Sequence, residues 1–153
     1  MDLILWRHAE ALDTQDGNED LERALSTRGE RQAARMAHWL NQNLAATTRV
    51  LVSPAQRCQQ TARALERKFK TVAELEPCGT VLGLLSAARW PEAREPVLVV
   101  GHQPALGLAA AYLLAGVEQS WRMKKGAVWW LRRRQSAGED ETALVAVRGP
   151  ENV

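Results

Sequence analysis

Four side chains in the sequence have the chemistry to hold and transfer a phosphoryl group. They are two arginines and two histidines: Arg7, His8, Arg57 and His102. Guanidinium groups bind phosphate oxygens through forked, charge-assisted hydrogen bonds, and a neutral imidazole nitrogen can attack phosphorus. The set therefore predicts a site for a tetrahedral dianion, with phosphate as its natural occupant.

Three short apolar runs are the elements that would position these side chains. Each run is typical of a strand buried on both faces. Polar residues follow every run: Arg7-His8 follow residues 3–6, Ser53 and then Arg57 follow residues 50–52, and Gly101-His102 follow residues 97–100. Because the carboxyl ends of parallel strands meet at one edge of a sheet, we expect the two arginines and two histidines to line one crevice.

Helical patterns separate these strands. We expect helices at residues 28–44, with Thr27 in a capping box, directly after the N-cap pair Ser53-Pro54, near residues 82–88, and at 104–117. A short strand near 72–75 and an edge hairpin of 127–131 and 143–147 complete the pattern. This alternation predicts an α/β three-layer sandwich, with a mainly parallel central sheet and helices on both faces. The length of 153 residues fits one domain, 1–153.

Charge and composition exclude several classes of function. Lys and Arg number 20 against 18 Asp and Glu, and the net charge of +2 gives no large field for nucleic acid or an anionic membrane. No apolar stretch reaches the roughly 20 residues that span a bilayer, and no export signal precedes Arg7, so we expect a cytoplasmic protein. Cys58 and Cys78 form neither a disulfide framework nor a zinc motif, and neither has a basic neighbourhood in the sequence.

Other site motifs are missing from the sequence. It has no phosphate loop of the Gly-x-x-x-x-Gly-Lys-Ser/Thr type, no Gly-x-Ser-x-Gly elbow and no His-Glu-x-x-His helix, so we expect neither metal nor cofactor. His38 falls within a predicted helix and is interpreted as structural. Lys124-Lys125 and Arg132-Arg133-Arg134 flank the pair Trp129-Trp130 and are interpreted as solvating a sheet edge rather than binding nucleic acid.

Three segments resemble the signature motifs of the histidine phosphatase superfamily. Arg7-His8-Ala9 is similar to the Arg-His-Gly motif, with Ala9 in place of glycine; residues 53–62 resemble Ser-Pro-x-x-Arg-x-x-x-Thr-Ala; and Gly101-His102-Gln103-Pro104 resembles the second histidine motif. Within the superfamily, the short length, segment 74–79 and Gly107 are similar to the SixA-type phosphohistidine phosphatases. The likeness covers nearly the whole chain and implies a phosphoglycerate mutase-like fold.

The resemblance implies a role for each member of the set. His8 would be the nucleophile that forms a covalent phosphohistidine intermediate, while Arg7, Arg57 and His102 would bind the phosphoryl oxygens. Ser53 and Thr14 are further candidates for contacts to phosphate, although a plain loop residue is the better interpretation of Thr14. The role of the acidic segment 13–22, expected to be a loop, stays open.

The acid that protonates an alkoxide leaving group in many relatives has no clear match, although Glu74 and Glu76 are candidates. Imidazole is a less basic leaving group, and a short chain has little material for a lid, so both features favour a phosphohistidine on a partner protein. The resemblance suggests a phosphotransfer domain as that partner, and we expect a monomer. Two alternatives stay open: a small-molecule phosphomonoesterase or mutase of the same superfamily, and a non-catalytic phosphohistidine-binding module.

Overall fold

A mixed six-stranded sheet forms the centre of the protein. The computed structural model describes residues 1–14, 17 and 19–153. The strands lie in the order β3-β2-β4-β1-β5-β6, with bounds β1 Asp2–Arg7, β2 Arg49–Val52, β3 Lys70–Thr71, β4 Val97–Gly101, β5 Val128–Ser136 and β6 Glu139–Arg148. Pairs β1–β4, β4–β2 and β2–β3 are parallel, whereas β5 is antiparallel to β1 and β6. The predicted α/β class with a mainly parallel sheet is confirmed.

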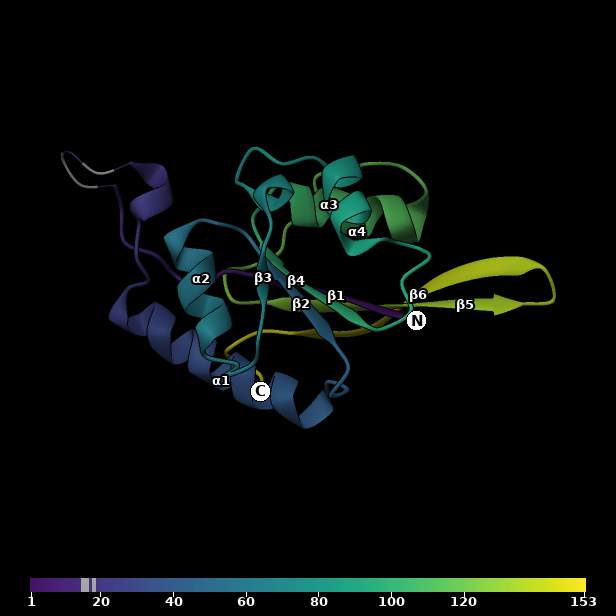
Figure 1. Ribbon diagram of the computed structural model, residues 1–153, viewed down its shortest axis with the longest axis horizontal. Coiled ribbons are helices and arrows are strands. Elements are labelled where there is room, and N and C mark those ends of the chain that lie inside the picture. Colours follow the sequence, from purple (N-terminus) through teal and green to yellow (C-terminus); the bar gives the residue numbers. More distant parts are fainter. Residues whose placement is uncertain (15–16, 18) are drawn as a thin grey trace.

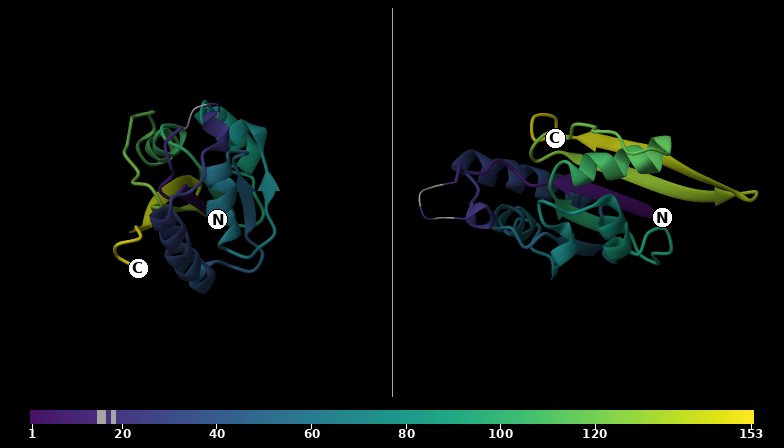
Figure 2. Two further views of the ribbon diagram at one scale, coloured as in Figure 1. Left: turned by 90° about the vertical axis from the view of Figure 1, so that its left-hand side faces the viewer. Right: turned by 90° about the horizontal axis from the view of Figure 1, so that it is seen from above.

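Helices cover both faces of this sheet. Figures 1 and 2 show α1 (Thr27–Asn43) and α2 (Gln56–Arg63) on one face, with α3 (Val81–Ala88) and α4 (Ala105–Ala115) on the other. In the described ranges, no helix combines the length and apolar character needed to cross a membrane.

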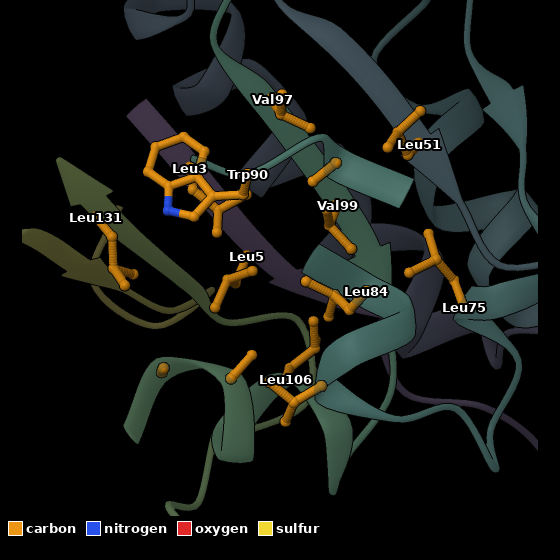
Figure 3. Close-up of a cluster of buried hydrophobic side chains, with 14 of the residues drawn as sticks. Leu3, Leu5, Leu51, Leu75, Leu84, Trp90, Val97, Val99, Leu106 and Leu131 are labelled. Carbon is orange, nitrogen blue, oxygen red and sulfur yellow. The ribbon is translucent and has the colours of Figure 1, made fainter. Parts of the chain in front are cut away.

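The central strands β1 and β4 are mostly apolar because each faces two cores. Successive side chains of a strand point to opposite faces. Ile4 and Trp6 of β1 therefore belong to the core beneath α1 and α2, whereas Leu3 and Leu5 belong to the core beneath α3 and α4. Figure 3 shows the second core, in which Leu84 of α3 and Leu106 of α4 lie against the sheet.

The start of α1 differs from the prediction by one residue. Ser26, rather than Thr27, is the capping residue: its backbone is extended and its Oγ accepts a hydrogen bond from the Gly29 N–H at 3.0 Å. The acidic segment before it is not wholly irregular, because Asp20–Glu22 form the 3-10 helix η1. Residues 15, 16 and 18 of that segment lie outside the described residues.

Two further local predictions are wrong. Ser53 does not cap α2, which begins at Gln56 after Ala55 as its N-cap: the Ser53 Oγ accepts from the Ala55 N–H at 3.2 Å and also contacts a histidine ring described below. The strand expected near 72–75 is the two-residue β3, which ends at Thr71, and Ala73–Leu75 form the 3-10 helix η2 instead.

The predicted hairpin is confirmed and is longer than expected. Its ladder runs from Val128 opposite Arg148 to Ser136 opposite Glu139, and its tip extends beyond the rest of the molecule in Figure 1. The edge strand is β6, and β5 pairs with β1 only as far as Arg132. Arg132 and Arg133 form ion pairs with Asp2 and Asp140, respectively.

Candidate active site

Two strand ends bring His8 and His102 together. Arg7, the last residue of β1, is in register with Gly101, the last residue of β4, and the His8 N–H donates to the Gly101 carbonyl at 3.1 Å. The two histidine rings follow directly, with centroids 5.3 Å apart. Arg57, in the first turn of α2, places Nη2 3.4 Å from Nδ1 of His102. We call Arg7, His8, Arg57 and His102 the His–Arg cluster.

The His8 ring is held in one tautomer. It is buried, and its Nδ1 lies 2.7 Å from the Ala9 carbonyl oxygen. Because a carbonyl only accepts hydrogen bonds, Nδ1 carries the proton and Nε2 keeps a lone pair. Burial lowers the pKa of His8 to about 4, helped by the charges of Arg57, Arg7 and Lys125 and opposed by the Ala9 hydrogen bond. Near neutral pH the ring is therefore uncharged, with a lone pair on Nε2.

The His102 ring is positioned by Ser53. Its Nε2 lies 2.8 Å from the Ser53 Oγ, while Nδ1 faces the Arg57 guanidinium, a group that only donates. It follows that Nε2–H donates to Ser53 and that Nδ1 keeps its lone pair. Burial, followed by the influence of His8 and the charge of Arg57, lowers the pKa of His102 to about 3. The Ser53 hydroxyl thus contacts this ring and the Ala55 N–H.

The two arginines keep donors free in a buried setting. Arg7 donates from Nη1 to the Met123 carbonyl at 2.8 Å and forms no ion pair within the described ranges. The Nε atoms of both Arg7 and Arg57 are buried without a hydrogen-bond acceptor in that part of the chain. Burial, and after it the charges of Arg122 and Arg57, lower the pKa of Arg7. Buried positive groups with free donors suit an anion.

Asp20 contacts the cluster, and sequence reasoning missed it. Arg57 donates from Nη1 to the Asp20 carbonyl at 2.8 Å and from Nη2 to the Asp20 Oδ2 at 3.1 Å. The other carboxylate oxygen of Asp20 accepts from Arg23 at 3.2 Å. The sequence around Asp20 has no periodicity that would relate it to α2, so no pattern linked this carboxylate to Arg57.

Thr61 joins α2 to the loop that carries His8. Its hydroxyl accepts from the Ala9 N–H at 3.1 Å and donates to the Arg57 carbonyl at 2.7 Å. The spacing of four residues between Arg57 and Thr61 puts both on one helix face, which is a signal in the sequence for this role. The Ala9 methyl group fits in place of glycine because it is fully buried in a small apolar cluster with Leu25 and Ala33.

Segment 121–127 borders the cluster on the side of His8. The Gly126 N–H donates to the His8 carbonyl at 2.9 Å, and the Gln103 side chain donates to the Trp121 carbonyl at 2.8 Å. Lys125 is therefore next in sequence to a residue bonded to His8, and its charge lowers the pKa of that histidine. Lys125 itself is exposed in the turn before β5, so its solvating role stays a prediction alongside this influence on His8.

Several sequence candidates are not joined to the cluster. Thr14 is exposed, and so is Glu74, while Glu76 is half-buried; within the described ranges, no hydrogen bond or ion pair connects any of them to the four residues. His38 is exposed on α1, and Cys78 is exposed as well.

Cys58 lies closer to the cluster than the sequence indicated. Its Sγ is buried 3.4 Å from Nε2 of His102. Burial raises the pKa of the Cys58 thiol to about 12, against the opposing influence of Arg57 and Ser53. A protonated thiol is a poor nucleophile, so Cys58 serves packing rather than attack.

Comparisons with known proteins identify the family of this chain. The family model of the histidine phosphatase superfamily (branch 1) matches residues 3–78. The phosphohistidine phosphatase SixA of Escherichia coli strain K12 is 36% identical over 125 residues, which is 76% of either chain. A SixA homolog of Haemophilus influenzae is 32% identical over 129 residues, covering 74% of this chain and 77% of its own. The solved structure of the protein histidine phosphatase SixA complexed with tungstate has a TM-score of 0.80 and 30% identity over 99% of each chain. The chain belongs to the histidine phosphatase superfamily.

Proposed function

We propose that this protein is a phosphohistidine phosphatase that takes phosphate from a partner protein through a covalent phospho-His8 intermediate. One observation carries the proposal: the neutral His8 ring, with its Nε2 lone pair free, belongs to a buried cluster whose guanidinium donors are not all used. The similarity to proteins named phosphohistidine phosphatase SixA supports the substrate class.

The first step transfers the phosphoryl group to His8. Nε2 of His8 attacks phosphorus in line, the new N–P bond forms, and the N–P bond of the substrate breaks, leaving its electron pair on the departing ring. Arg7 and Arg57 hold the equatorial oxygens through charge-assisted hydrogen bonds from their guanidinium groups. The Ala9 carbonyl stabilises the positive charge that develops on the His8 ring, because it accepts from Nδ1–H.

The second step releases phosphate to water. Water attacks phosphorus, an O–P bond forms, and the bond to Nε2 breaks. Since Nδ1 of His8 still carries its proton, the departing ring leaves as neutral imidazole rather than as an anion. One proton of the attacking water stays on phosphate and the other passes to solvent.

His102 is proposed to hold the phosphoryl group after taking a proton. Its Nδ1 has a lone pair in the free protein, and an arriving dianion favours the protonated form of a neighbouring ring. Ser53 fixes the plane of the ring through Nε2, so that the new Nδ1–H points away from Ser53 and donates to a phosphoryl oxygen.

The surroundings of the cluster support a nitrogen leaving group over an alkoxide. In the described part of the chain, neither of the candidate acids, Glu74 and Glu76, makes a hydrogen bond or ion pair to the four residues of the cluster. An alkoxide needs such an acid, whereas a protonated phosphoimidazole loses a neutral imidazole without it. We therefore infer a phosphotransfer domain, which carries phosphohistidine, as the partner. We also propose that residues 1–153 fold as one domain, because a single sheet runs through them.

Turnover by a single substituted variant tests the proposal. His8→Ala is expected to lower the rate on a phosphotransfer domain that bears phosphohistidine by about a thousandfold or more, because the nucleophile is lost. His38→Ala, which alters an exposed histidine of α1, is the matched control and should keep the wild-type rate. A His8→Ala variant within tenfold of the wild type would reject the mechanism, and faster turnover of a phosphoserine peptide by the wild type would reject the substrate class.

A further inference from the structure

Asp20 sits at the boundary between the buried cluster and solvent. The Arg57 side chain is 5% exposed, whereas the Asp20 side chain that pairs with it is 52% exposed. Both the carbonyl and the carboxylate of Asp20 bind this one guanidinium. Among the residues that the structure describes, Asp20 is the one whose carboxylate pairs with an arginine of the cluster. The ring of a partner protein must approach the cluster from solvent, and the Asp20 carboxylate is exposed to solvent beside Arg57.

The carboxyl group of Asp20 stays ionised. Partial burial raises its pKa, but hydrogen bonds from Arg23 and Arg57 and their charges outweigh burial and lower the pKa below its ordinary value. An ionised carboxylate has no proton to give, so Asp20 is unsuited to be the acid that protonates a leaving group. It is suited to accept a hydrogen bond from a leaving group that already carries a proton.

We propose that Asp20 is a specificity-determining residue, whose carboxylate accepts a hydrogen bond from the free N–H of the phosphoimidazole ring and so selects nitrogen-linked phosphate. This inference rests on the proposed function. It assigns a contact that favours phosphohistidine, in addition to the lack of a general acid.

The chemistry of the leaving ring gives this hydrogen bond its effect. When the N–P bond breaks, its electron pair stays on the ring nitrogen that carried phosphorus. The ring departs as neutral imidazole only if its other nitrogen holds a proton, because otherwise it departs as a strongly basic imidazolate. A carboxylate beside the protonated nitrogen stabilises that form of the substrate, and the proton stays on the departing ring. A phosphate ester of a phenol has no such N–H and gains nothing from Asp20.

The test compares two small substrates in the variant Asp20→Asn. Phosphoimidazole carries the ring N–H when its second nitrogen is protonated, and p-nitrophenyl phosphate has a good leaving group without one; neither brings contacts from a partner protein. The amide keeps the shape of Asp20 and leaves its backbone carbonyl bonded to Arg57, but it removes the negative charge. We expect kcat/KM on phosphoimidazole to fall roughly tenfold to a hundredfold relative to its value on p-nitrophenyl phosphate, the range for a lost charge-assisted hydrogen bond.

Controls separate this role from others. Glu22→Gln removes a neighbouring charge from η1 without touching Arg57 and should leave the ratio of the two rates unchanged. Inhibition by tungstate reports whether Arg57 still binds an oxyanion. This inhibition should be no weaker in Asp20→Asn than in the wild type.

Two results would overturn the inference. Equal loss on both substrates means that Asp20 only places Arg57, and equal or faster turnover on both means that the carboxylate only competes with phosphate for that guanidinium. Failure of the proposed function is a separate outcome, since the wild type itself would then not turn over phosphoimidazole.

Discussion

The Thr61 hydroxyl accepts a hydrogen bond from the Ala9 N–H at 3.1 Å, although 52 residues separate the two in the chain. Ala9 follows His8 directly, and the same hydroxyl donates to the carbonyl of Arg57. One fully buried side chain therefore sets the distance between the proposed nucleophile and an arginine proposed to bind phosphate.

Replacement of Thr61 by valine is expected to reduce both stability and turnover. Valine keeps the shape but leaves the buried Ala9 N–H without an acceptor, which costs about 1–3 kcal/mol of folding free energy. Because the His8 loop loses its tether to α2, kcat should fall on the order of tenfold. Thr61→Ser, which keeps the hydroxyl, is the control. Urea unfolding and steady-state rates measure the two effects, and a Thr61→Val protein with wild-type kcat would remove Thr61 from the positioning of His8.

The two cysteines should differ sharply in reactivity. Cys78 is exposed, whereas Cys58 is buried with its pKa raised to about 12 by burial. In the native protein we expect an aromatic disulfide reagent to modify Cys78 quickly and Cys58 only after unfolding. Peptide mass spectrometry identifies the modified residue. Rapid modification of native Cys58, accompanied by loss of turnover, would contradict the assignment of this thiol to packing.

Acid should destabilise the fold through its buried histidines. Burial lowers the pKa values of His8 and His102 to about 4 and about 3, below the ordinary value of 6.5 that each regains on unfolding. From pH 6.5 down to about 4 the unfolded state binds more protons than the folded state, so stability is lost as the pH falls through this window. The slope is roughly 1 kcal/mol per pH unit for each histidine.

Urea midpoints at pH 7, 6 and 5 measure this slope. His102→Asn should flatten it, whereas His38→Asn, which changes a ring that stays in water, should not. A slope that is the same in all three proteins would mean that the histidines of the cluster take up protons in the folded state as readily as in the unfolded one.

The sequence predicted the strand ends because their pattern is physically simple. A short apolar run followed by a polar residue marks a buried strand and its carboxyl end, and the parallel sheet then brings Arg7-His8 and His102 to one edge. The position of Arg57 at this edge could also be predicted, because only a short connection joins β2 to α2. These inferences depend on local pattern and on one topological rule, both of which can be read from a single sequence.

The remaining contacts depend on tertiary geometry, which the periodic spacing of apolar residues in the sequence does not reveal. Ser53 was expected to cap a helix, but the register of β2 with β4 brings its hydroxyl to the ring of His102. Asp20 reaches Arg57 from a segment whose path is set by the Ala11–Leu25 bridge, a contact without a sequence signature. The interpretation of Lys125 did not include the pairing of β5 with β1, which brings the turn before β5 next to His8.

Detection of phosphate on one nitrogen of His8 tests the central claim most directly. Wild-type protein is mixed with a phosphohistidine donor, quenched within milliseconds in alkali, which preserves phosphohistidine, and digested for tandem mass spectrometry and phosphorus NMR. Since Nδ1 is held by the Ala9 carbonyl, the account predicts one phosphate per chain on Nε2 of His8 and none in His8→Ala. Phosphate on His102, on Cys58 or on Nδ1 of His8, or turnover without any phosphorylated protein, would contradict it.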